Sequence, residues 1–130
     1  MYTVVRFTDE GASVAALEEI GQELNRVQPG VYAAPHRTGD GFAVDVCVSD
    51  LWSDHAEAIA ATLRTWDGAL VLALQRGLSV CVDIAVEPED LQGRTTLCLG
   101  YGTDLVLRMA RAGVRLEVSI YACDAEAGDQ

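Results

Sequence analysis

The chain has 130 residues, half of them hydrophobic, and its twenty acidic and nine basic residues give a formal net charge of −11. This length and hydrophobic content suit one folded domain, which we place at residues 1–123, and they exclude a disordered chain. All nine basic residues are Arg and they form no basic patch in the sequence, which excludes nucleic acid as an expected partner.

The first third of the chain predicts three strands and one helix. Alternating apolar residues predict a strand over residues 2–7. Apolar residues spaced three and four apart then predict a helix over residues 14–27. A short strand is expected over residues 31–34 and a clear one over residues 42–48. The turn sequence at residues 38–41 predicts that these two strands form a hairpin.

The middle of the chain predicts an interrupted helix followed by a strand. The helix is expected to begin at Ser53, to break at residues 67–68 and to resume over residues 69–76. A strand over residues 80–84 follows and leads into an acidic loop. We expect this strand to form a second hairpin with a strand at residues 97–99.

The last third predicts a helix over residues 103–112 and a strand over residues 116–120, and residues 124–130 are expected to be an acidic, disordered tail. The predicted order of elements is β-α-β-β-α-β-β-α-β. Strands that pair in hairpins imply an α+β fold with a single, largely antiparallel sheet. The helices between the hairpins should pack on one face of that sheet.

Four segments of the last two thirds of the chain form a recognisable pattern. They are the helix start at residues 50–52 (DLW), the strand at residues 80–84 (VCVDI), the helix end at residues 109–113 (MARAG) and the strand at residues 116–121 (LEVSIY). In this pattern the chain resembles a bacterial family catalogued as domain of unknown function 4279. The resemblance implies an α+β fold, and some relatives look like immunity proteins that sit beside toxins. It implies no catalytic residues.

The period of two places one set of strand side chains on the sheet face away from the helices. Four cysteines share that phase: Cys47, Cys81, Cys98 and Cys123. The charged and aromatic residues of the same face form a candidate ligand or partner surface: Arg6, Asp45, Asp83, Glu117 and Tyr121. The alternative interpretation is a half-solvated face with small residues beneath a loop or a dimer partner. Trp52 is expected either in the core or as an anchor at an interface.

No spacing of residues points to a metal, a cofactor or a catalytic centre. The cysteines lack the paired spacing of zinc ligands, so four reduced thiols are expected. His55 lies in the first turn of a helix beside Asp54, where we expect an exposed side chain. The acidic loop at residues 87–90 is shorter than a calcium-binding loop.

The acidity and the lack of a catalytic constellation favour a non-enzymatic protein-binding domain whose partner is a basic protein. An immunity-like antidote to a toxin is one form of this role. One alternative is a small-molecule binder or enzyme that uses the open sheet face, and another is a structural homo-oligomer such as a homodimer. Carboxylates gathered on one surface would favour the basic partner, whereas a pocket around Asp45, Asp83 and Glu117 would favour a ligand.

The expected location of the chain is the cytoplasm. Its N-terminus lacks the basic start and apolar run of a signal peptide. No apolar stretch reaches the roughly 20 residues that a membrane-spanning helix needs.

Overall fold

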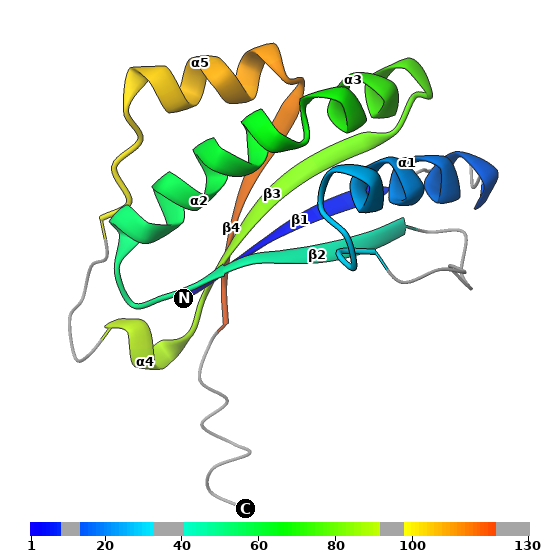
Figure 1. Cartoon of the computed structure of the whole chain (residues 1–130). Coiled ribbons are helices and arrows are strands. Elements are labelled where there is room, and N and C mark those ends of the chain that lie inside the picture. The colour runs from blue at the N-terminus through cyan, green and yellow to red at the C-terminus, as the bar shows by residue number, and fades with distance from the viewer. Residues whose placement is uncertain (9–13, 33–40, 92–97, 122–130) are drawn as a thin grey trace, which may run out of the picture.

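The computed structural model describes residues 1–8, 14–32, 41–91 and 98–121, and within them it shows an α+β fold. Four longer helices lie on one face of a four-stranded sheet (Figure 1). We call this side of the sheet the helix face and the other side the open face. The elements are β1 (Tyr2–Thr8), α1 (Val14–Val27), β2 (Gly41–Val48), α2 (Trp52–Thr65), α3 (Asp67–Gln75), β3 (Ser79–Val86), α4 (Pro88–Leu91), α5 (Thr103–Arg111) and β4 (Val114–Ile120).

The sheet has the strand order β2-β1-β3-β4. Strand β1 pairs antiparallel with both β2 and β3, whereas β3 pairs parallel with β4. The sheet is therefore mixed, and the prediction of a largely antiparallel sheet is wrong in this respect. Helix α5 is the cause, because it carries the chain back across the helix face so that β4 starts at the same end as β3.

The two predicted hairpins are also wrong. Val31 and Tyr32 lie in a bend after α1, and β2 pairs with β1 instead; residues 33–40 lie outside the described part. Cys98 and Leu99 belong to no strand, and residue 97 lies outside the described part. The observed order within these limits is β-α-β-α-α-β-α-α-β.

A tertiary contact explains why the segment after α1 is not a strand. Tyr32 is buried against Gly21 of α1 so closely that a Cβ at position 21 would lie 2.0 Å from two carbons of its ring. Its hydroxyl donates a hydrogen bond to the carboxylate of Glu18 at 2.8 Å, and its backbone N–H donates to Asn25 at 2.8 Å. The segment therefore folds back on the helix that precedes it.

The helices bury the faces that their apolar spacing predicts. Leu17, Ile20 and Leu24 of α1 are fully buried. The predicted interruption of the helix is confirmed, but it lies at Trp66, between the end of α2 at Thr65 and the start of α3 at Asp67, so residues 67–68 belong to α3. None of the helices that the structure describes is long and apolar enough to cross a membrane.

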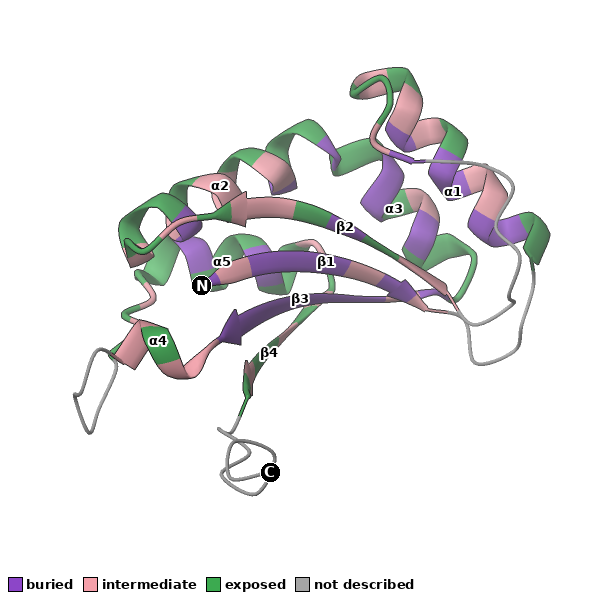
Figure 2. Ribbon diagram, turned by 90° about the horizontal axis from the view of Figure 1, so that it is seen from below, coloured by how far each residue is buried: buried purple, intermediate pink, exposed green. Residues whose placement is uncertain are grey.

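The edge strand β4 is much less covered than the two central strands (Figure 2). The alternation in β4 predicts that Val118 and Ile120 lie in the core, but 44% of Val118 and 72% of Ile120 is exposed. Val114 and Leu116, at the start of the strand, do pack against the core. The phase of the strand is thus as predicted, but the helices cover only its first half.

Candidate functional site

The open face carries the three predicted carboxylates in a single row across the sheet. The strand register places Asp45 beside Val4, Val4 beside Asp83, and Asp83 beside Glu117. Residues paired across neighbouring strands share one face of a sheet. The structure therefore brings these side chains into line, with the apolar Val4 separating Asp45 from the other two.

Asp83 is the buried centre of this row, with only 3% of its surface exposed. Arg6 donates to Oδ2 of Asp83 from Nη2 at 3.0 Å and from Nε at 3.3 Å. The hydroxyl of Ser119 donates to Oδ1 at 2.8 Å. Both carboxylate oxygens are thus hydrogen-bonded within the chain, and Asp83 holds β1, β3 and β4 together.

The charges of the open face largely cancel one another. The next row of the sheet contains Arg6 and Arg115, one on each side of Cys81. Arg115 forms an ion pair with Glu117 at 3.2 Å, as Arg6 does with Asp83. Asp45 is exposed and has no ion pair with a described residue. Two arginines therefore face three carboxylates, which leaves little net charge to attract a ligand.

Nothing in the described part of this face forms a metal centre, because no three His, Cys, Asp or Glu side chains in that part come close enough together to hold an ion. Asp83 and Glu117 are neighbours, but each already binds an arginine. The arrangement is that of a structural ion-pair network, whose members fix the strands of a sheet face on which none of the four longer described helices packs.

Tyr121 lies at the end of this face, beside Tyr2. The hydrogen bond between the two hydroxyls raises the pKa of Tyr2 to about 12, with smaller contributions from burial and from the nearby carboxylates of Glu87 and Asp83. Tyr121 itself is 44% exposed. Of the predicted site residues, Arg6, Asp83, Glu117 and Tyr121 thus form one connected stretch of the open face.

Trp52 is the predicted site residue that lies elsewhere. It begins α2 on the helix side of the molecule, where its Nε1–H donates to the carbonyl of Gly100 at 2.6 Å. Its ring stacks on His55 and meets the ring of Tyr101 edge-on, with centroids 5.0 Å apart. Trp52 is half-buried and ties the start of α2 to the loop before α5, so it does not join the row of carboxylates.

The cysteines do not share one face, because a bulge changes the phase of β2. The pairing of β1 with β2 shifts between Thr3 and Val4, and this puts Cys47 opposite Thr3, which points toward the helices. Cys81 remains on the open face, where it is 4% exposed and burial raises the pKa of its thiol. Cys98 is exposed and lies outside the strands. Cys123 is beyond the described residues.

We expect thiol reagents to label Cys98 at least about tenfold faster than Cys81 in the folded protein, because reaction requires an accessible thiolate. Cys98 is exposed, whereas Cys81 is buried and its raised pKa lowers its thiolate fraction. Peptide mapping by mass spectrometry after short labelling times measures both rates in one sample. Unfolding in urea is the control and should bring the two rates together; equal rates in the folded protein would contradict the register of β3.

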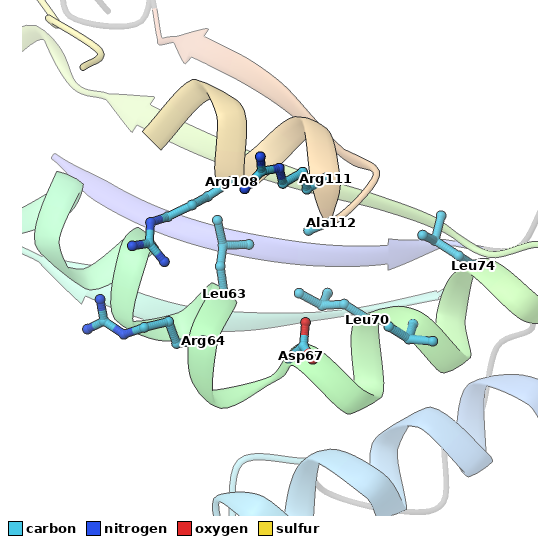
Figure 3. A pocket seen from close by; sticks show the side chains of 9 residues that line it. Leu63, Arg64, Asp67, Leu70, Leu74, Arg108, Arg111 and Ala112 are labelled. Atoms are coloured by element: carbon cyan, nitrogen blue, oxygen red, sulfur yellow. The ribbon is translucent and has the colours of Figure 1, made fainter. Parts of the chain in front are cut away.

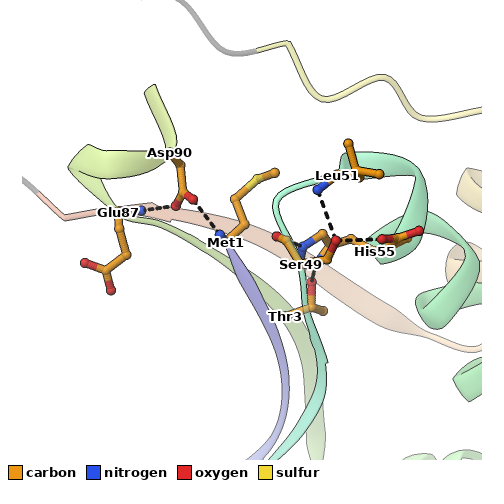
Figure 4. A network of polar contacts seen from close by, with 8 residues as sticks. Met1, Thr3, Ser49, Leu51, His55, Glu87 and Asp90 are labelled. Atoms are coloured by element: carbon orange, nitrogen blue, oxygen red, sulfur yellow. Dashed lines mark hydrogen bonds and ion pairs between the residues drawn. The ribbon is translucent and has the colours of Figure 1, made fainter. Parts of the chain in front are cut away.

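His55 is fully buried, so the expectation of an exposed helix-start residue is wrong. Its Nε2 lies 2.8 Å from the carbonyl oxygen of Ser49, and its Nδ1 lies 2.7 Å from the hydroxyl of Thr3 (Figure 4). A carbonyl can only accept, so Nε2 carries the hydrogen, and in the neutral ring the Thr3 hydroxyl donates to Nδ1. The ring thereby connects β1, the loop after β2 and α2.

Further polar contacts close the same end of the molecule (Figure 4). The carboxylate of Asp90 accepts from the α-amino group of Met1 at 2.6 Å and from the backbone N–H of Glu87 at 2.7 Å. Burial would raise the pKa of Asp90, but these two hydrogen bonds outweigh it and lower the pKa. The hydroxyl of Ser49 donates to Asp54 at 2.6 Å. The groups that meet here are satisfied by one another, which indicates a structural role.

Carboxylates gather on the surface around this network. Figure 1 shows α4 and the first turns of α2 and α5 at the same end of the sheet. We call this surface the acidic end and define it by five residues on these segments or in the connections just before them: Asp50, Asp54, Glu87, Glu89 and Asp104. None of the seven described arginines lies on these segments.

The acidic end also exposes the most accessible large apolar side chains in the described part of the chain. Val48 is 81% exposed, Ile120 is 72% exposed and Leu51 is 62% exposed. Strand alternation could not identify these two strand residues. It assigns Val48 to the helix face, but the bulge in β2 pairs Val48 with Tyr2 of the open face, and it assigns Ile120 to a part of β4 that the helices leave exposed. One signal in the sequence could have indicated this surface. Asp50 and Leu51, an acidic and an apolar residue, are adjacent in the short loop between a strand and a helix.

Comparisons of the chain with protein-family models, with curated proteins and with solved structures find no match.

Proposed function

We propose that this chain is a non-enzymatic binding domain for a protein with a basic surface, and that the acidic end is the docking surface. The observation that carries the proposal is the coincidence of carboxylates and exposed aliphatic side chains at that end. Asp50 and Leu51 are adjacent and both exposed, with Val48 just before them. Binding surfaces of proteins commonly combine apolar contact area with complementary charge.

The open sheet face supports this proposal indirectly, because it has few free charged groups that could bind a ligand. Its buried carboxylate, Asp83, is already bound to Arg6 and Ser119. The acidic end differs in that only Asp54 among its five carboxylates accepts a side-chain hydrogen bond from a described residue. Charges without ion-pair partners are available to a partner's cations, and they also accelerate association by electrostatic steering.

Within this class, we propose the role of an immunity-like antidote to a toxin. The support is the resemblance in the segments at residues 50–52, 80–84, 109–113 and 116–121. An antidote acts by covering its target, so it needs a stable, charge-complementary surface and no catalytic centre. The expected partner is therefore the basic product of an adjacent toxin gene.

The test compares two neutralised variants for association with the adjacent gene's product. Asp50→Asn/Glu89→Gln removes two charges from the acidic end, and we expect the association rate at low salt to fall several-fold. Glu19→Gln/Glu23→Gln removes the same charge from α1 and is the control. The rate for the unchanged protein should fall as salt rises, since salt screens exposed charges beyond about 8 Å at physiological ionic strength.

Three outcomes would count against the proposal. They are an association rate that ignores salt, an equal loss for the α1 variant, and binding of nucleic acid at physiological salt. Growth of cells that produce the toxin tests the antidote role separately. The unchanged domain should rescue growth, and Asp50→Asn/Glu89→Gln should rescue it less well than Glu19→Gln/Glu23→Gln.

A further inference from the structure

A groove of about 380 Å³ lies on the helix side of the molecule, between α2 and α3 on one wall and α5 on the other. Its apolar surface comes from Leu63 and Leu70, which are buried, and from Val71 and Leu74, which are nearly half exposed. Figure 3 shows the leucines between the two walls. Its volume is within the range of small-molecule pockets, and its lining combines apolar with charged side chains.

Three arginines line this groove: Arg64 from the last turn of α2, and Arg108 and Arg111 from the last turn of α5. Arg115 follows α5 closely in the sequence, but it is not among the residues that line the groove and it pairs with Glu117. Asp67 is the carboxylate that lines the groove, and it forms no ion pair within 4 Å with the arginines there.

The groove arginines differ from all the other described arginines in that they form no ion pair with a described residue. Arg6, Arg26, Arg76 and Arg115 each form an ion pair with a carboxylate. The remaining three of the seven described arginines have no ion pair with a described residue, and all three line the same groove. Their positive charges at helix C-termini stabilise the helices. Because their guanidinium groups have no ion pair with a described carboxylate, these groups are free to bind an anion.

We propose that the groove binds a small amphiphilic anion, with its apolar body on the leucines and its anionic head group against the arginines. A guanidinium presents a planar fork of donors that matches a carboxylate or a phosphate. The occupant should be small, because a polyanion or an acidic protein would be repelled by a chain with a net charge of −11. A small anion in the groove feels mainly the charges within the screening length of about 8 Å.

The test uses octanoate, followed by isothermal titration calorimetry and by NMR shifts of the protein. Acetate carries the head group without the body, and 1-octanol carries the body without the charge. We expect saturable, one-to-one binding of octanoate at least about tenfold tighter than that of either control compound. Octyl phosphate in place of octanoate distinguishes a phosphate head group from a carboxylate, and saturable binding of either amphiphile supports the proposal.

Variants locate the site. Arg108→Gln/Arg111→Gln should weaken octanoate binding at least about tenfold, because charge-assisted hydrogen bonds to the head group are lost. Arg26→Gln/Arg115→Gln changes the net charge equally on other surfaces and should leave the affinity unchanged. Val71→Asp places a carboxylate on the groove wall and should also weaken binding. Circular dichroism confirms that each variant is folded, and Arg64→Gln serves if the double variant is not.

The proposal is overturned if neither octanoate nor octyl phosphate saturates the protein, if the amphiphile that binds does so no better than 1-octanol, or if both double variants bind it equally. Binding of an acidic peptide but of neither amphiphile would likewise replace the small anion with a protein partner. These results are independent of the acidic end, whose variants should bind octanoate like the unchanged protein.

Discussion

His55→Ala is expected to lower the free energy of unfolding by about 3–5 kcal/mol, the range for losing a large buried side chain together with its hydrogen bonds. The ring is fully buried and bridges the carbonyl of Ser49 and the hydroxyl of Thr3 at 2.8 and 2.7 Å. Its removal leaves a cavity and two polar groups without partners at the junction of β1, β2 and α2. Urea denaturation followed by circular dichroism measures the change.

Two further variants separate the contributions to this effect. Thr3→Val keeps the shape of the side chain but removes the hydroxyl that bonds Nδ1, and we expect a loss of about 1–3 kcal/mol. Glu57→Ala, at an exposed position of the same helix, should change the free energy by less than about 0.5 kcal/mol. If His55→Ala were no more destabilising than Glu57→Ala, the buried position of the ring would be wrong.

Trp66→Ala is expected to cost about 3–5 kcal/mol of unfolding free energy, because it removes the largest fully buried side chain of the described core. Trp66 is 1% exposed at the junction of α2 and α3, and its ring lies 6.1 Å from that of Phe7. Its Nε1–H donates to the side-chain oxygen of Gln28 at 3.0 Å, which ties the end of α1 to the junction.

The matched control for this variant is Trp52→Ala. Trp52 is only half-buried, so the same substitution there removes less buried area and should be less destabilising. Circular dichroism is the appropriate measurement, since both variants alter the tryptophan fluorescence. A smaller loss for Trp66→Ala than for Trp52→Ala would show that the junction of α2 and α3 is not the centre of the core.

The candidate sites differ in how far the sequence could predict them. Asp45, Asp83 and Glu117 share a phase, and the register confirms that they lie in one row. The assignment of Cys47 to the same face fails because the shift between Thr3 and Val4 inserts an extra residue into the pairing. A bulge reverses which side chains face the helices without disturbing the apolar alternation on which the prediction depends.

The arginine groove and the acidic end could not be predicted, because their residues come from segments that are far apart in the chain. Arg64 and Arg108 are 44 positions apart, and only the packing of α2 against α5 places them on one groove. Asp50 and Glu89 likewise share one end of the sheet only because β2 and β3 both finish there. A charge in the sequence carries no information about which distant charges will pair with it.

The sequence by itself determined where the main helices and strands lie, because apolar spacing is a local property that each element carries along its own length. It also predicted that the helix is interrupted near residues 67–68, one position after the observed interruption at Trp66. Only the tertiary structure decided that β4 runs parallel to β3, that Val118 and Ile120 remain exposed, and that His55 is buried. These outcomes depend on which distant segment covers a given side chain, and that coverage is settled by how all the elements pack together.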